Sequence, residues 1–110
     1  MAIHVNFLGR LIADPIEKNI NGNTCAIFTQ VTDSLVRDKD NKRKPIFISV
    51  TAWNNNATNI LKYCQKGIQI LTTGKVYDLS AYSRKDNGEP APSLSVTLDD
   101  FEFPNNKKER

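Results

Sequence analysis

The hydrophobic pattern of this chain changes from a period of two residues to a period of 3.6 only once, directly after Trp53. On both sides of that change, apolar residues alternate with polar ones, as in half-buried β-strands. Just after it, apolar residues recur at i, i+3, i+4 and i+7, which predicts an amphipathic helix of about three turns. These residues are Ala57, Ile60, Leu61 and Cys64. One helix between two groups of strands restricts the possible folds more than any other feature.

The residues that flank this segment predict where the helix begins and ends. Asn54 or Asn55 is expected to cap the first turn by accepting a hydrogen bond from a free amide. Lys62 and Lys66 are expected near the C-terminal end, where the helix dipole favours cations. Gly67 is expected to end the helix.

Five segments have the alternation of β-strands: 3–11, 24–33, 45–53, 68–82 and 93–98, the last continuing towards Phe101 and Phe103. Asn21-Gly22 predicts a hairpin turn, whereas Gly9 and Gly74 indicate bends within strands. The order β-β-β-α-β-β predicts an all-β OB-fold, a five-stranded Greek-key barrel with one helix between strands three and four. A split barrel or an SH3-like fold competes, but the position of the helix disfavours both. The barrel is expected to span residues 1–104 and to be followed by a short, polar, disordered tail at 105–110.

Length and composition limit the class of protein. The chain has 110 residues, which fits one domain. No apolar run approaches the roughly 20 residues that cross a bilayer, and no signal peptide is recognisable, so a cytoplasmic protein is expected. Cys25 and Cys64 are expected to be reduced thiols in the core. His4, the only histidine, is expected to point outward from the first strand without a catalytic role.

The two faces of segment 45–53 differ in character. One face, formed by Ile46, Ile48, Val50 and Ala52, is purely apolar and predicts core. The other carries Phe47 and Trp53 at about 20 Å separation, with Ser49 and Thr51 between them. Aromatic rings on an open, hydroxyl-lined sheet can stack nucleobases. A second core layer or a subunit interface would explain the same pattern.

Charge is concentrated directly before this strand. Residues 36–44 contain five basic and two acidic residues, a net +3 that equals the net charge of the whole chain. A basic segment leading into an aromatic strand suggests a polyanionic ligand that lies across both. The alternative is a solvated hairpin tip without a ligand.

Motifs spread along the chain resemble those of bacterial-type single-stranded DNA-binding proteins. The resemblance rests on Asn6-Phe7-Leu8-Gly9-Arg10-Leu11 with Asp14-Pro15, on Asn21-Gly22, on the segment 47–53, on the segment 59–67 and on Gly74-Lys75-Val76. Each motif is common by itself, but their order and spacing over residues 3–103 are specific. The resemblance implies an OB-fold protomer that binds single-stranded DNA in replication, recombination or repair. It further implies a homo-oligomer, a tetramer rather than a dimer, without cofactor, metal or catalytic activity.

The resemblance also assigns roles to individual residues. Phe47 and Trp53 match base-stacking positions, and Tyr82 approximates a third. The phosphates would be neutralised by basic residues: Arg10, Arg37, Lys39, Lys42, Arg43, Lys44, Lys75, Arg84 and Lys85. The expected partner is single-stranded DNA, with RNA bound more weakly, and the expected location is the cytoplasm in association with the nucleoid. No membrane and no small-molecule substrate is expected.

Two departures from the family pattern leave an alternative function open. Leu35 and Val36 stand where the family has a further aromatic residue, so weaker binding is expected. Residues 99–104 resemble the acidic tip of replicative members, but they fall where the last strand should end, and a short relative without the tail is expected. The alternative is an OB-fold accessory protein of replication restart or recombination that acts mainly through protein contacts. A nuclease is disfavoured because the one adjacent carboxylate pair, Asp99-Asp100, would point to opposite sides of a strand.

Overall fold

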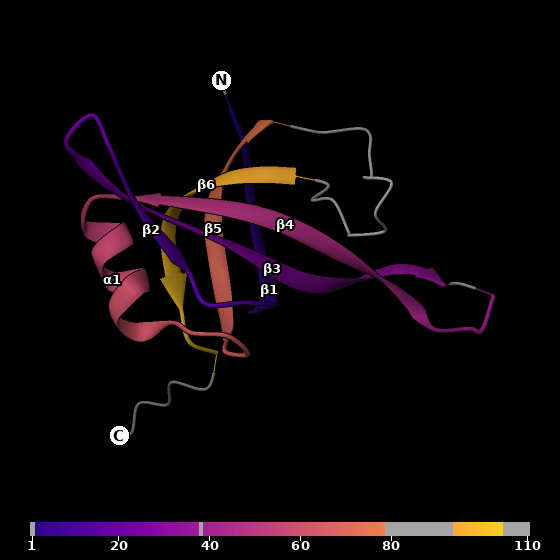
Figure 1. Ribbon diagram of the computed structural model, residues 1–110. Helices are drawn as coiled ribbons and strands as arrows, with labels where there is room; N and C mark the ends of the chain where they lie inside the picture. The colour runs from indigo at the N-terminus through magenta and orange to yellow at the C-terminus, as the bar shows by residue number, and fades with distance from the viewer. Residues whose placement is uncertain (1, 38, 79–93, 105–110) are drawn as a thin grey trace, which may run out of the picture.

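The computed structural model of the protein describes residues 2–37, 39–78 and 94–104 (Figure 1). Within these residues the chain forms six strands and one helix. The elements are β1 (Ile3–Leu11), β2 (Ile16–Ile20), β3 (Asn23–Arg37), β4 (Arg43–Trp53), α1 (Asn55–Tyr63), β5 (Gln69–Asp78) and β6 (Leu94–Glu102).

The strands form a sheet that closes on itself. Their order is β1-β5-β6-β4-β3-β2, and β1 also pairs with β3, which joins the two sides of the sheet into a barrel. All neighbours are antiparallel except β4 and β6, which are parallel. β2 and β1 pair with successive stretches of the same edge of β3. The five strands β1, β3, β4, β5 and β6 thus make the predicted barrel, and β2 extends it beside β3.

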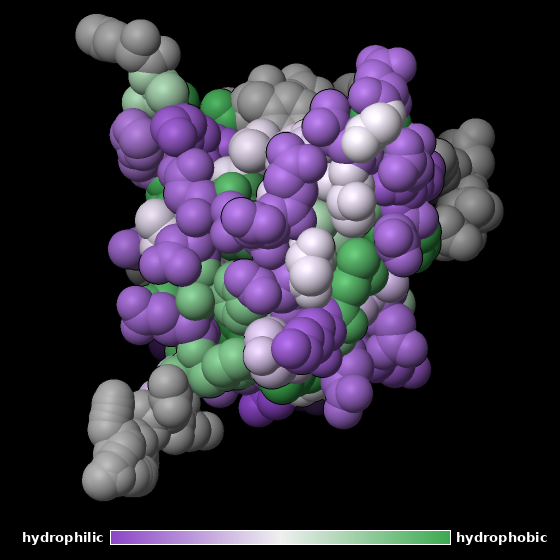
Figure 2. Space-filling view, turned by 90° about the vertical axis from the view of Figure 1, so that its left-hand side faces the viewer, coloured by the Kyte–Doolittle hydropathy of each residue, from purple (hydrophilic) through white to green (hydrophobic). Residues whose placement is uncertain are grey.

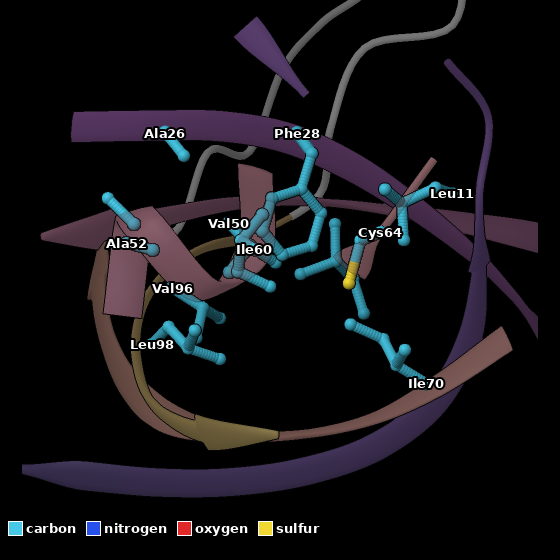
Figure 3. Close-up of a cluster of buried hydrophobic side chains, with 12 residues drawn as sticks. Leu11, Ala26, Phe28, Val50, Ala52, Ile60, Cys64, Ile70, Val96 and Leu98 are labelled. Carbon is cyan, nitrogen blue, oxygen red and sulfur yellow. The ribbon is translucent and has the colours of Figure 1, made fainter. Parts of the chain in front are cut away.

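The core fills the inside of this barrel and the space under α1 (Figure 3). Ile48, Val50 and Ala52 of β4 are buried, as their shared face predicted. From the helix, Ala57 and Ile60 complete the core with no exposed surface. Val96 and Leu98 of β6 close it from the other side. Because the inward face of β4 is committed to this core, its other face must point away from the barrel axis.

A buried polar network lies where β1 closes the barrel on β3. Gln30 is completely buried, and its amide donates to the carbonyl oxygens of Gly9 at 3.1 Å and Ile70 at 3.3 Å. The hydroxyl of Thr72 donates to the side-chain oxygen of Gln30. A Cβ atom at position 9 would lie 2.8 Å from the carbonyl oxygen of Val31, so glycine permits this approach. The network connects β1, β3 and β5 at one point.

One strand was missed by the sequence prediction. The five segments predicted from the sequence do not include Ile16–Ile20, which is β2 and pairs with β3 over five residues. All five residues of β2 are exposed. The strand therefore has no apolar inner face, which is the feature that reveals a strand in a sequence.

The predicted helix is correct in place but too long. α1 ends at Tyr63, so Lys66 lies beyond it, and Gly67, with φ 89°, belongs to a later turn in which its amide donates to Leu11. The predicted side-chain cap is wrong, because Asn54 makes no such hydrogen bond. Asn54 instead adopts φ 55°, and its carbonyl oxygen accepts the amide of Thr58 at 2.9 Å.

Most of the basic segment 36–44 belongs to the hairpin formed by β3 and β4. β3 continues to Arg37 and β4 begins at Arg43, and these two residues are paired across the hairpin. Figure 1 shows the two strands extending beyond the barrel as an arm. We call residue 37 and residues 39–44 the basic arm.

The remaining predictions concern the C-terminal strand, the cysteines and the membrane. β6 includes residues 99–102. The rings of Phe101 and Phe103 pack edge to face against each other and lie against the core, so this segment is structural as predicted. Cys25 and Cys64 are both free and buried; Cys64 belongs to the core cluster, as predicted, whereas Cys25 does not. No helix in the described part of the chain is long and apolar enough to cross a membrane. The predicted tail, residues 105–110, lies outside the described residues.

Candidate nucleic-acid interface

The outward faces of β3 and β4 form one continuous surface, which we call the outer strip. Pairing across the two strands places Cys25 beside Trp53, Ile27 beside Thr51, Thr29 beside Ser49 and Val31 beside Phe47. The parallel neighbour β6 adds Ser95 beside Ser49 and Thr97 beside Thr51. Paired residues share a face of the sheet. The outer strip therefore has an aromatic ring near each end and hydroxyl groups between them.

Phe47 and Trp53 lie on the outer strip and not in the core. Both are partly exposed, and neither packs against the buried cluster. They are six positions apart on an extended strand, which corresponds to about 20 Å. The alternative that this face is a second core layer is therefore wrong. Two separated, partly exposed rings on a surface of small polar side chains can each hold the flat face of a base.

Arg10 is placed at the Phe47 end of the outer strip. It pairs with Val31, which in turn pairs with Phe47, so the three residues form one row across three strands. The guanidinium group donates to the carbonyl oxygen of Gly67 at 3.0 Å. This bond uses one of five N–H donors and leaves others for a ligand oxygen.

The basic arm continues from the same end. Its residues Lys39, Lys42, Arg43 and Lys44 are exposed, and Lys44 precedes Phe47 by three residues on β4. The backbone of Arg37 lies in β3, but its side chain is outside the description. The arm and the Phe47 end of the outer strip thus form a connected basic and aromatic surface.

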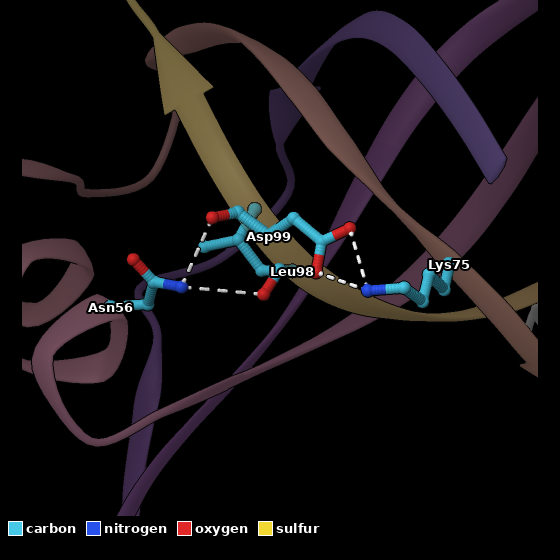
Figure 4. Close-up of polar contacts among 4 residues, drawn as sticks. All are labelled: Asn56, Lys75, Leu98 and Asp99. Atoms are coloured by element: carbon cyan, nitrogen blue, oxygen red, sulfur yellow. Dashed lines mark hydrogen bonds and ion pairs between the residues drawn. The ribbon is translucent and has the colours of Figure 1, made fainter.

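Lys75 is less available than the sequence suggested. Its ammonium group forms an ion pair with Asp99 at 3.1 Å, and both side chains are partly exposed (Figure 4). The main chain at Asp99 is held by Asn56 of α1, whose amide donates to the carbonyl oxygens of Leu98 and Asp99. Asp99 thereby offsets much of the charge that Lys75 would present to a phosphate.

Three predicted site residues, Tyr82, Arg84 and Lys85, lie outside the described residues. Among the described ones, the structure brings Phe47, Trp53, Arg10 and the basic arm onto connected surfaces. Lys75 on β5 pairs with Thr97 of the outer strip and so borders the same surface, but its ammonium group is held by Asp99. The described part of the chain contains no cluster of three histidine, cysteine or acidic residues that would hold a metal ion.

Sequence reasoning missed one neighbour of Trp53. Cys25, which pairs with Trp53, is buried but does not belong to the core cluster, and on its other side it pairs with Lys18 of β2. Burial raises the pKa of the Cys25 thiol, and the nearby Lys18 ammonium group partly opposes this rise. The positive charge of Lys18 therefore acts on Cys25, the residue next to Trp53. No apolar alternation marks β2 in the sequence; its signal was the Asn21-Gly22 turn, because a hairpin turn joins two strands.

Comparisons with known proteins agree with this geometry. The model of the Single-strand binding protein family matches residues 3–104. "Single-stranded DNA-binding protein 1" of Clostridium acetobutylicum is 29% identical over 104 residues, covering 93% of each chain. The second single-stranded DNA-binding protein of Mycobacterium smegmatis superimposes with a TM-score of 0.71 at 17% identity, over 100% of this chain and 97% of that one. The small single-stranded DNA-binding protein of Streptomyces coelicolor gives a TM-score of 0.73 at 14% identity, over 99% and 98%. The two solved structures establish likeness of fold.

Proposed function

The chain belongs to the single-strand binding protein family, and from this premise we propose that it binds and protects single-stranded DNA without regard to sequence. Its role is binding rather than catalysis, in keeping with a family of non-enzymatic DNA-binding proteins. Single strands exposed during replication, recombination or repair are the ligands that such a protein serves.

The position of Phe47 and Trp53 carries this proposal. Both rings lie on the outer strip, outside the core, with small hydroxyl residues between them. Stacking on an aromatic ring contributes about 1–3 kcal/mol per base and accepts every base, because all bases have a flat π-face. Two rings about 20 Å apart therefore bind a strand without reading its sequence.

Phosphate neutralisation by the basic arm and Arg10 supplies the second part of the mechanism. Each phosphate that a lysine or arginine neutralises releases condensed counterions, so affinity falls as salt rises. We include Tyr82, Arg84, Lys85 and Arg37 in the proposed contact set on the resemblance alone. Lys75 is expected to contribute less, since Asp99 already holds its ammonium group.

Alanine substitution of the two rings tests the stacking mechanism. Phe47→Ala and Trp53→Ala should each weaken binding of a labelled dT oligonucleotide by about 5-fold to 150-fold, the equivalent of about 1–3 kcal/mol. Tyr63→Ala is the matched control, because Tyr63 is an exposed aromatic residue on α1 rather than on the outer strip. If all three variants bind equally well, or if the two ring variants fail to fold, stacking on the outer strip is refuted.

We further propose that the protein assembles with copies of itself, as a tetramer rather than a dimer. Ile3 and Leu8, on opposite faces of β1, are 59% and 41% exposed, so each face has an apolar side chain that association could cover. Light scattering distinguishes tetramer, dimer and monomer by mass. Weaker binding of RNA and association with the nucleoid follow from the same proposal, and competition of poly(U) against poly(dT) measures the first of these.

A further inference from the structure

β2 presents an exposed face that the proposed DNA site does not yet include. Its five residues are all exposed, and Ile16 and Ile20 are among the most exposed large apolar side chains, at 59% and 40%. Alternation along the strand places Ile16, Lys18 and Ile20 on one side and Glu17 and Asn19 on the other. Figure 2 shows the side of the molecule that carries α1 and the turn after β2, where hydrophobic side chains lie between hydrophilic ones.

This face of β2 continues the outer strip. Lys18 pairs with Cys25, which pairs with Trp53, and Ile16 pairs with Ile27, which pairs with Thr51. Neighbouring strands are separated by about 4.8 Å, so Lys18 lies two strands, or about 10 Å, from Trp53. Arg10 stands in the same relation to Phe47 through Val31. Each ring therefore has one cation in its own row, two strands away.

Lys18 is also available for a ligand. Among the residues that the structure describes, it forms no ion pair or hydrogen bond, in contrast to Lys75, which is held by Asp99. Glu17, its acidic neighbour in sequence, points to the other side of β2. Lys18 can form an ion pair with the phosphate of a nucleotide, and the two exposed isoleucines beside it can pack against the apolar faces of its base or sugar.

We propose that the Ile16, Lys18 and Ile20 face of β2 is a further part of the DNA site, where single-stranded DNA continues after the base stacked on Trp53. Lys18 pairs with a phosphate beside that base, and the two isoleucines pack against neighbouring bases or sugars. This inference rests on the proposed function, because the occupant is the same DNA strand. Its support is continuity with the outer strip and the complementary charge of Lys18.

Removal of the charge tests the phosphate contact. The matched pair is Lys18→Gln and Lys62→Gln, since Lys62 is an exposed cation on α1 that lies over Tyr63, away from the outer strip. Both changes lower the net charge by one. For each variant, the affinity for poly(dT) is measured over a series of salt concentrations. Lys18→Gln should reduce the slope of log affinity against log salt by about 0.7, the value for one phosphate of a single strand, and Lys62→Gln should leave the slope unchanged. Equal slopes for the two variants would overturn the proposal.

Protection of an introduced thiol tests whether DNA covers the isoleucines. Ile20→Cys places a reactive group on the exposed face of β2, while the native cysteines are buried. Poly(dT) should slow its reaction with a maleimide, duplex DNA should not, and Tyr63→Cys should react equally fast with and without DNA. If the thiol at position 20 is already unreactive without DNA, a protein surface covers β2 and the inference fails.

The outcome for the unmodified protein separates the two proposals. If it does not bind poly(dT), the proposed function fails and takes this inference with it. If it binds, but either the salt slopes of Lys18→Gln and Lys62→Gln are equal or poly(dT) does not protect Ile20→Cys, the inference about β2 alone is refuted.

Discussion

The buried network at Gln30 provides the sharpest test of how this barrel is closed. Replacement of Gln30 by leucine puts a side chain of similar size in its place but removes the hydrogen bonds to Gly9, Ile70 and Thr72. Each bond contributes about 1 kcal/mol, and the hydroxyl of Thr72 is left buried without this partner at a cost of about 1–3 kcal/mol. Added apolar burial by leucine offsets part of this loss. We expect Gln30→Leu to lower the free energy of unfolding by about 3 kcal/mol.

Thermal unfolding followed by circular dichroism measures this effect. For a domain of this size a loss of about 3 kcal/mol lowers Tm by roughly 12 °C. Thr72→Val removes the hydroxyl that would otherwise remain unpaired, so the double variant should be at least as stable as Gln30→Leu alone. The two effects are therefore strongly non-additive in a double-mutant cycle. Thr29→Val, on the outward side of the same strand, should change stability by less than about 1 kcal/mol. An unchanged Tm for Gln30→Leu, or simple additivity, would refute the assigned role of the network.

Three further predictions follow from individual contacts. Gly74→Ala should cost about 2–3 kcal/mol of stability in chemical denaturation, because a Cβ atom there would overlap the carbonyl oxygen of Thr97; an unchanged midpoint would contradict this. Asp99→Asn should strengthen DNA binding by up to about fivefold at low salt by releasing Lys75, while changing stability by less than about 1 kcal/mol; weaker binding would show that Asp99 supports the site. Burial raises the pKa of the Cys64 thiol to about 11 from its ordinary value of 9.0. The unfolded chain therefore loses this proton first, and stability should fall between about pH 9 and pH 11. The pH dependence of denaturation should be smaller in Cys64→Ala, and an equal dependence would exclude this origin.

Much of the fold follows from hydrophobic periodicity. β4 alternates because one face meets the barrel core and the other points away from it, where Phe47, Ser49 and Trp53 are partly exposed although Thr51 is buried. This pattern identified Val50 as core and Trp53 as lying outside it. The single change of period located α1 because its buried face is made by residues such as Ile60. Where one face of a segment lies in the core and the other does not, the periodicity of its apolar residues indicates both the secondary structure and the buried face.

The missed features lack that contrast. Both faces of β2 are exposed, so its sequence has no alternation of apolar and polar residues. It is a strand because it pairs with β3. The completely buried Gln30 points into the barrel because Gly9, Ile70 and Thr72 satisfy its amide, and these partners are distant in sequence. Such positions depend on tertiary contacts and cannot be recognised from a local pattern.

The candidate site was predicted in part for the same reason. Phe47 and Trp53 were recognisable because aromatic rings interrupt a polar face on one strand. The row from Arg10 through Val31 to Phe47 and the row from Lys18 through Cys25 to Trp53 each cross three strands. Only the register of the barrel brings these cations level with the rings.

The central claim is that bases stack on the outer strip, and Trp53 reports on it directly because it is the only tryptophan in the chain. Titration of the unmodified protein with poly(dT) should quench the tryptophan fluorescence, and the affinity derived from the quench should fall steeply as salt rises. Duplex DNA should bind far more weakly and quench little. An absent quench, or equal affinity for single-stranded and duplex DNA, would contradict the account.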